Sequence, residues 1–378
     1  MSYHGRFEQA KQPKQPKQPG KKKGLKIFLI VIAVILVLLL IFAGAVYLFL
    51  QSKLKKMNII ELPKDTYAYT EPTDEVTRPP ETGAAETTEA TTEATVPKMT
   101  ADDIVNILFV GQAARAGEEE TMADSTMLVS INTYTKEITC MSILRDSFVK
   151  LPDYKGHQCG RAKFTVCYNL GYQWGGGTAG GMEMTNICLK DNFGIEVDYN
   201  VEVSFDSFIK MIDYIDGVDI DLTQAEADYL NKDTLYVKRT IEPGVQRLQG
   251  MEALSYARMR KAAGDSESDI KRTERQRKVV EALLEKFRYR SIADLNKWID
   301  ILLPMVSTTM TPTDVTKLAA RVLPIFSELK IKGATVPMEG WGDMVDIYQE
   351  GQIHSVMRFD TAKEKKLIRA ITEAEVSD

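Results

Sequence analysis

The longest hydrophobic segment of the chain runs from Ile27 to Leu50. It contains no charged residue and consists almost wholly of Ile, Leu, Val, Phe and Ala. A segment of this length and composition can span a bilayer as a helix. Ala43-Gly44-Ala45 resembles a signal-peptidase site, but the apolar run continues beyond it to Leu50. The pattern therefore predicts a single, uncleaved transmembrane helix over residues 27–50.

Beyond residue 100, short apolar runs alternate with amphipathic stretches. The apolar runs predict strands over 104–110, 126–131, 137–144, 201–203 and 218–222, the first three forming a meander. The amphipathic stretches predict helices over 182–192, 204–215, 275–288, 292–303, 312–326 and 361–371. The Gly-rich segment 171–181 is expected to be a mobile surface loop. This alternation predicts an α/β fold, as a layered αβα domain around a central mixed sheet.

Composition divides the chain into four parts. Residues 1–26 form a basic arm with a repeated Lys-Gln-Pro unit, and residues 51–100 are rich in Thr, Glu, Pro and Ala. Both compositions are typical of disordered segments, so 27–50 is expected to be followed by a disordered stalk and then by a folded domain over 101–378. A mucin-like glycosylated stalk is the alternative for 51–100. The basic arm favours a cytoplasmic N-terminus and an extracytoplasmic domain.

Charge and histidine content exclude several classes of function. The formal net charge is −5, which gives no basic signature for nucleic acid. The chain has only 3 His, and no Ser-His-Asp grouping, His-Glu-x-x-His or Cys-x-x-Cys motif is found. Cys140 lies in an apolar strand and is expected to be an inert core residue. Cys159, Cys167 and Cys188 would face an oxidising exterior, where one bridge among them can form, with its pairing left open.

Polar residues occupy a helix face that ought to be buried. The helix after Asp269, a plausible N-cap, carries the apolar stripe Val280, Leu283, Leu284 and Phe287. Extended backwards, this stripe meets Gln276, then Arg272 or Thr273, then Asp269. Charges are rarely buried without a partner. Either these groups pair with one another, or they line a cavity that holds an anion.

Further cations lie close to these segments and strand ends. Arg258 and Arg260 precede the helix, and their alternate spacing leads us to expect one to point inward and the other to solvent. Arg145-Asp146 follows the third strand, where strand-end residues often line a site. Arginine binds phosphate through two parallel hydrogen bonds. An acid beside such a cluster can hold Mg²⁺, and Asp124 is the best candidate.

Several motifs, in order, resemble one family. The segments are NILFVG, ADSTMLVSIN, MSILRDSFVKLP, LQGMEALSYARMR and DIKRTERQR, between Asn106 and Leu284. Together with the anchor, they resemble the LytR-CpsA-Psr family of Gram-positive-type cell envelopes. The resemblance implies a transferase that moves an anionic glycopolymer, such as teichoic acid or capsule, from a polyprenyl-pyrophosphate carrier to peptidoglycan.

The same resemblance implies roles for individual residues. It places the lipid pyrophosphate against basic and polar side chains, namely Arg115, Arg145, Lys163, Arg258, Arg260, Asp269, Arg272 and Gln276. It assigns Mg²⁺ to Asp124. The expected catalytic residues are Asp124, Arg145 and Asp146. Either Asp124 or Asp146 would be the general base.

The chain departs from the family pattern at three positions. An acid is usual where Ala113 stands, an arginine where Met122 stands, and a proline where Leu144 stands. Loss of the first acid is expected to weaken or move the metal site. The alternative function is therefore a scaffold or regulator that binds lipid pyrophosphate with weakened catalysis. A transcriptional role is disfavoured because the cytoplasmic arm has no helix-turn-helix pattern.

Overall fold

The computed structural model describes residues 56–62, 99–100, 103–112, 123–260, 262, 268–288, 301–338, 342–349 and 352–373, with the backbone alone at 124, 268, 269 and 349. The predicted basic arm, the predicted membrane helix and most of the predicted stalk lie outside these residues. Among the described residues, no helix is both long enough and apolar enough to cross a membrane.

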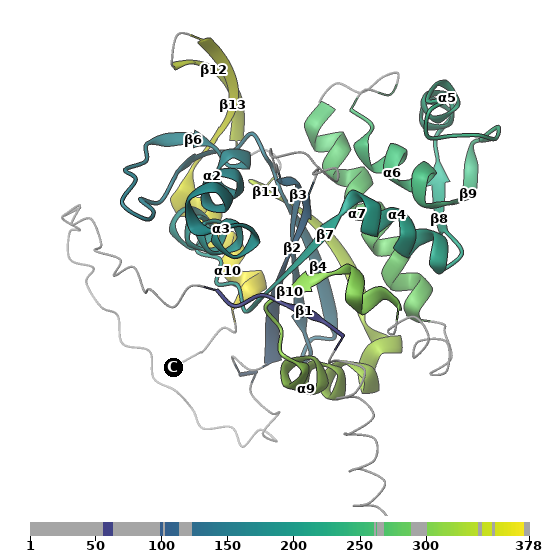
Figure 1. Cartoon of the computed structure of the whole chain (residues 1–378), viewed down its shortest axis with the longest axis horizontal. Helices are drawn as coiled ribbons and strands as arrows, with labels where there is room; N and C mark the ends of the chain where they lie inside the picture. Colours follow the sequence, from purple (N-terminus) through teal and green to yellow (C-terminus); the bar gives the residue numbers. More distant parts are fainter. Residues whose placement is uncertain are drawn as a thin grey trace, which may run out of the picture. The chain divides into compact units, whose positions relative to one another are not determined.

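A 7-stranded mixed sheet forms the centre of the domain (Figure 1). Its strands lie in the order β1 (Asn58–Ile59), β10 (Ser307–Thr308), β7 (Tyr199–Ser204), β2 (Ile104–Gln112), β3 (Ala123–Asn132), β4 (Glu137–Ile143) and β11 (Lys330–Val336). β2, β3 and β4 form the predicted antiparallel meander, and β7 and β11 run parallel to β2 and β4. The predicted mixed sheet is confirmed.

Helices cover both faces of the sheet (Figure 1). Leu108 and Val110 of β2 belong to the core shared with α2 (Thr165–Gly175), α3 (Thr178–Phe193) and α10 (Thr361–Thr372). Val105 and Ile107 belong to the core shared with α7 (Ser268–Arg288) and α9 (Pro312–Val322). Because successive residues of a strand point to opposite faces, this alternation builds the two cores. The predicted αβα layering is confirmed.

A second helical group packs beside α7. It consists of α4 (Phe205–Tyr214), α5 (Gln224–Lys232), α6 (Gly250–Arg258) and the hairpin of β8 (Val218–Leu222) and β9 (Gly244–Leu248). Its core reaches α7 through Val279, whereas Val280 and Leu284 of α7 pack against the sheet. Contacts on both sides of α7 explain why polar residues of this helix are buried.

Some sequence expectations are wrong in detail. The Gly-rich segment 171–181 is the end of α2 and the start of α3, joined by a turn at Gly176 and Gly177. Residues 58–59, assigned to the disordered stalk, form β1 and pair with β10. Helix α7 begins at Ser268, so Asp269 lies in its first turn rather than at its N-cap. The predicted helix over 292–303 falls largely outside the described residues.

Short strand pairs complete the fold. β5 (Phe148–Lys150) pairs with β6 (Arg161–Lys163), and β12 (Gly342–Gln349) forms a hairpin with β13 (Gln352–Phe359). The hairpin extends away from the sheet (Figure 1). At its base, Ser147 forms a bridge with Met357, so β13 lies beside the loop that follows β4.

Candidate functional site

Several strand ends meet at one edge of the sheet. Gln112, the last residue of β2, pairs with Ala123 at the start of β3 and with Ser204 at the end of β7. Ile143, the last residue of β4, pairs with Val336 at the end of β11. Loops that leave such an edge carry side chains close together. The loop after β4 begins with Leu144, Arg145 and Asp146, and here the candidate site begins.

Asp146 lies between two cations in this loop. Its Oδ1 is 2.7 Å from Nζ of Lys163, and its Oδ2 is 3.8 Å from Nε of Arg145. The exposed fractions of the side chains are 24% for Arg145, 16% for Asp146 and 27% for Lys163, so all three reach solvent. A guanidinium and an ammonium group in one loop region are groups that can bind an anionic ligand. The structure thus brings together three of the predicted site residues.

Backbone hydrogen bonds hold this loop from two sides. The Met357 amide of β13 donates to the Asp146 carbonyl at 2.8 Å, and the Thr165 amide of α2 donates to the Arg145 carbonyl at 3.0 Å. The Thr165 hydroxyl also donates to the Ala123 carbonyl of β3, at 3.3 Å. The start of α2 is therefore connected both to the loop after β4 and to the strand that contains Asp124.

Arg258 and Arg260 both lie on the surface. Met259 between them is fully buried, and its backbone is extended, with φ −58° and ψ 119°. In an extended segment, residues two apart point the same way. The expectation that one of the two arginines points inward is therefore wrong. The Arg258 guanidinium lies 5.2 Å from the centre of the Phe205 ring and 3.3 Å from the Tyr236 hydroxyl, which it reaches through Nη1.

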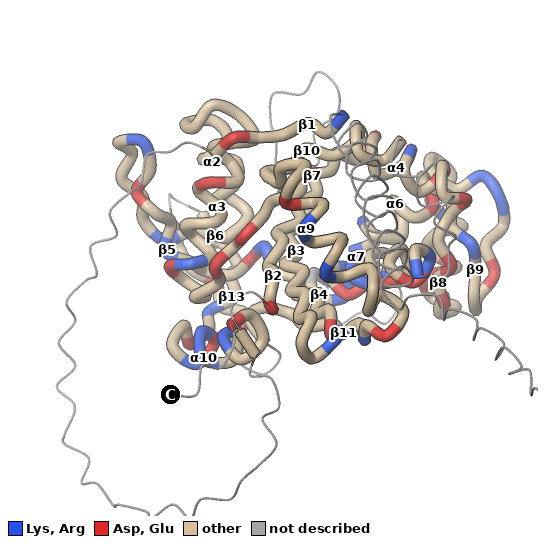
Figure 2. The backbone as a smooth tube through the Cα atoms, turned by 90° about the horizontal axis from the view of Figure 1, so that it is seen from below, with Lys and Arg blue, Asp and Glu red and all other residues tan. Residues whose placement is uncertain are grey.

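Two arginines of helix α7, Arg272 and Arg275, are buried. Arg272 is 4% exposed, as is Arg275 one turn further on. Arg275 Nε lies 2.9 Å from Glu226 Oε1 of α5, and Arg275 Nη1 donates to the Met259 carbonyl at 3.2 Å. Figure 2 shows the basic positions of α7 close to β4. Arg275 therefore pairs internally, whereas Arg272 and the partly exposed Gln276 remain candidates for the site.

The Arg275 and Glu226 pair was not predicted from sequence. Burial opposes ionisation of Glu226, but hydrogen bonds from the Thr223 amide and from Arg275 hold its pKa below the ordinary value. Glu226 is at the N3 position of the α5 capping box, which was a signal in the sequence for a fixed carboxylate. Nothing in the local sequence indicates that its partner lies on α7.

A buried carboxyl group, Glu202 of β7, was also missed. It accepts hydrogen bonds from the hydroxyls of Tyr168 on α2 and Thr178 on α3, the latter at 3.1 Å. Burial raises the pKa of Glu202 above its ordinary value, although both hydrogen bonds act in the opposite direction. The group lies two residues before the end of β7, beneath the α2–α3 pair.

The described residues do not by themselves make a magnesium site. Within these parts of the chain, no group of three or more His, Cys, Asp or Glu side chains lies close enough to hold a metal ion. Asp146 is already paired with Lys163. The predicted ligand Asp124 is described only in its backbone, as is Asp269, and Arg115, Ala113 and Met122 lie outside the described residues. The Mg²⁺ prediction therefore still depends on Asp124 and its neighbours.

An α/β domain with arginine and lysine side chains gathered around the strand ends of a mixed sheet is suited to binding an anion. The sequence identifies the family of the protein. Residues 76–365 match the LytR_cpsA_psr family, and the chain belongs to that family.

Relatives and solved structures agree with this assignment. The chain is 30% identical to the regulatory protein MsrR of Staphylococcus aureus, over 66% of this chain and 69% of MsrR. It is 31% identical to the polyisoprenyl-teichoic acid–peptidoglycan teichoic acid transferase TagT of Bacillus subtilis, over 53% of this chain and 57% of TagT. A crystal structure from Streptococcus agalactiae has the same fold, with a TM-score of 0.58 and 24% identity, covering 73% of this chain and 90% of that one.

Proposed function

We propose that this protein is a membrane-anchored phosphotransferase that attaches an anionic glycopolymer, carried on polyprenyl pyrophosphate, to peptidoglycan. Its membership of the LytR_cpsA_psr family and its similarity to TagT support this activity. A TagT structure with bound octaprenyl pyrophosphate shares the fold, with a TM-score of 0.51, 20% identity, and coverage of 74% of this chain and 94% of that one. In our proposal, residues 27–50 anchor the chain, the N-terminus is cytoplasmic and the domain faces a Gram-positive-type envelope.

The arrangement of Arg145, Asp146 and Lys163 carries the proposal. Pyrophosphate is an anion with several oxygens, and a guanidinium can bind two of them at once. We assign Arg145 and Lys163 to the pyrophosphate, with Asp146 positioning both through the contacts at 3.8 and 2.7 Å. The remaining proposed contacts are Arg115, Arg258, Arg260, Asp269, Arg272 and Gln276.

In the proposed reaction, a hydroxyl oxygen of a peptidoglycan sugar attacks the phosphorus that carries the glycopolymer. A new phosphorus–oxygen bond forms, the bond from this phosphorus to the bridging oxygen breaks, and polyprenyl phosphate leaves with that oxygen. Negative charge grows on the bridging oxygen and is stabilised by the fixed cations. The hydroxyl proton passes to a carboxylate. Asp124 and Asp146 are the two candidates for this carboxylate.

We assign Mg²⁺ to Asp124, where it would neutralise phosphate charge. All other steps of the proposal depend on the side chains of the protein. Arg145 and Lys163 orient the pyrophosphate, and the backbone contacts of the Arg145 and Asp146 carbonyls hold the loop in place.

The test uses the full chain in lipid vesicles with a polyprenyl-pyrophosphate-linked glycan and peptidoglycan fragments. We expect polyprenyl phosphate to be released in step with attachment of the glycan, measured by mass spectrometry of lipid and glycan fractions. Binding of the lipid pyrophosphate without any transfer, at every Mg²⁺ concentration, would rule out the enzyme.

A binding scaffold or regulator is the second candidate, because Ala113 stands where the family has an acid. The variant Ala113→Asp separates the two candidates. If the missing acid at position 113 weakens Mg²⁺ binding, this variant should raise Mg²⁺-dependent transfer without changing lipid binding. No gain, together with no transfer by the natural chain, would favour the scaffold.

A further inference from the structure

Helices α2 and α3 lie against each other at very short range. A Cβ atom placed on Gly175 of α2 would be 2.5 Å from Cα of Gly180 on α3. One helical turn before Gly175, a Cβ atom on Gly171 would be 2.7 Å from Cβ of Met184. Each step of four residues along α2 is matched by a step of four along α3, in the opposite direction. The two helices are therefore antiparallel, with residues paired in register across their contact.

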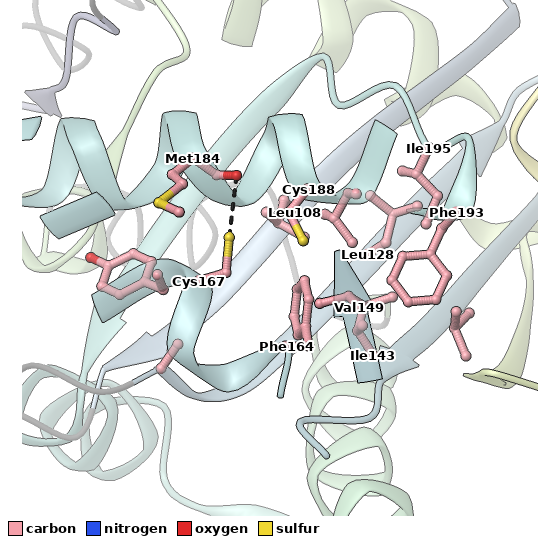
Figure 3. Close-up of a cluster of buried hydrophobic side chains, with 14 of the residues drawn as sticks. Leu108, Leu128, Ile143, Val149, Phe164, Cys167, Met184, Cys188, Phe193 and Ile195 are labelled. Atoms are coloured by element: carbon pink, nitrogen blue, oxygen red, sulfur yellow. Dashed lines mark hydrogen bonds between the residues drawn. The ribbon is translucent and has the colours of Figure 1, made fainter. Parts of the chain in front are cut away.

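The next pair in this register is Cys167 and Cys188. Two further observations place these cysteines together. The Cys167 thiol donates to the Met184 carbonyl, one turn from Cys188, at 3.3 Å. Burial raises the pKa of Cys167 well above its ordinary value, and the neighbouring Cys188 thiol raises it further. Figure 3 shows the side chains of both cysteines in one buried cluster, with the Cys167 thiol directed at the Met184 carbonyl.

The spacing of the two helices at the neighbouring pair is also in the range that a disulfide can span. At the neighbouring pair, the contact of 2.7 Å and two carbon–carbon bonds of about 1.5 Å bring the Cα atoms of Gly171 and Met184 within about 6 Å. Disulfides usually join Cα atoms about 4.4–6.8 Å apart. In the structure, all four cysteines are free.

We propose that Cys167 and Cys188 form an intramolecular disulfide that fastens α2 to α3 when the domain folds in an oxidising compartment. This compartment is the exterior location of the proposed function. The oxidant is a small or protein disulfide. One cysteine thiolate attacks it and releases one thiol, and the second cysteine then attacks the mixed disulfide and releases the other. The two cysteines lose two electrons and two protons in total, and the oxidant gains them.

The other two cysteines fit this role less well. Cys140 lies on the opposite face of the sheet, in the core shared with α7 and α9. Cys159 lies before β6, and its thiol points to the His157 carbonyl at 3.9 Å. The bond between α2 and α3 would also act on the site, because α2 starts two residues after Lys163 and its Thr165 amide holds the Arg145 carbonyl.

The bond is tested on the full chain, purified in detergent, unfolded and then refolded in a buffer of oxidised and reduced glutathione. Free thiols are blocked by an alkylating agent, and the protein is digested without reduction. We expect mass spectrometry to find the peptides of Cys167 and Cys188 joined, with Cys140 and Cys159 alkylated. Recovery of Cys167 and Cys188 both alkylated, or a bridge to Cys159, would overturn the proposal.

A stability measurement supplies the second test. Reducing agent should lower the melting temperature of the bridged protein by roughly 5–10 °C. Cys167→Ala, Cys188→Ala and the double variant should all lose this response to reductant, whereas Cys140→Ala should keep it. Equal responses in the natural chain and the double variant would overturn the bond. The same alkylation on protein taken directly from the cell membrane tests the compartment separately, since a bond formed only on refolding would contradict the exterior location and not the pairing.

Discussion

Arg275 Nε lies 2.9 Å from Glu226 Oε1, and both side chains are buried, 5% and 6% exposed. The same arginine donates to the carbonyl of Met259, the residue between Arg258 and Arg260. One buried ion pair therefore joins α5 and α7 and fixes the segment that presents two of the proposed pyrophosphate ligands. The pair belongs to the framework of the site, and its loss should affect folding before it affects chemistry.

Arg275→Met is expected to destabilise the domain by about 3–5 kcal/mol, because it leaves the Glu226 carboxylate buried without its cation. Adding Glu226→Gln to Arg275→Met should recover part of this loss, since the remaining side chain is neutral and can still cap α5. The measurement is denaturant unfolding of the full chain at neutral pH.

The matched control is Arg247→Gln. Arg247 also forms an ion pair, at 2.9 Å from Asp219, but both side chains are 50% exposed. No measurable change in stability is expected there, because water replaces the lost partner. An Arg275→Met protein that unfolds at the same denaturant concentration as the natural chain would show that the buried pair contributes nothing.

Arg145→Ala and Lys163→Ala are each expected to slow glycan transfer by about 100–1,000-fold, the usual effect of removing one group that stabilises developing charge. Arg145→Lys should retain only part of the activity, because an ammonium cannot donate two parallel hydrogen bonds to one phosphate as a guanidinium can. Transfer is measured with saturating lipid substrate. Lys190→Ala is the control: this lysine is 64% exposed and pairs with Glu196, away from the strand-end loop.

Lys163 could instead serve only to neutralise Asp146, and the double variant Asp146→Asn/Lys163→Met tests this. If the two residues only balance each other, the double variant should transfer glycan at the natural rate. We expect it to remain as slow as the Lys163 variant, because the ligand has lost a cation.

Glu202→Gln is expected to change how stability depends on pH. Burial raises the pKa of Glu202 above its ordinary value of 4.5. Between that value and the raised one, the folded protein holds a proton that the unfolded chain has lost, so the natural chain loses stability as pH rises through this window. The glutamine variant cannot ionise and should lose less stability over the same range, measured by urea unfolding from roughly pH 4 to 8.

Glu226→Gln provides a comparison of opposite sign. The pKa of Glu226 is held below its ordinary value of 4.5. Its contribution to stability is therefore present above pH 4.5 and is lost as pH falls through the lowered value.

For Glu202, parallel curves of stability against pH for the natural chain and Glu202→Gln would contradict a raised pKa.

The features predicted correctly from sequence are those set by local periodicity. The apolar runs around Leu108 and Val129 predicted buried strands, and Arg145-Asp146 was placed at a strand end. The features that sequence could not supply depend on contacts made far along the chain. Glu226 and Arg275 are 49 residues apart, and nothing local identifies them as partners. Gly171 was assigned to a loop because glycine weakens an isolated helix, whereas here it permits a close helix contact.

Gly171→Ala tests that last point directly. The added methyl group would lie 2.7 Å from Cβ of Met184 and closer still to the backbone carbonyl oxygen of Gly180, so α2 and α3 must move apart. The expected cost is about 1–3 kcal/mol of unfolding free energy. Neither Met184→Ala nor Met184→Gly should rescue the variant, because the contact with the Gly180 backbone remains and the buried Met184 side chain is lost. Gly160→Ala is the control, because its added Cβ would meet nothing within 4 Å. A Gly171→Ala protein as stable as Gly160→Ala would mean that the two helices are not in close contact.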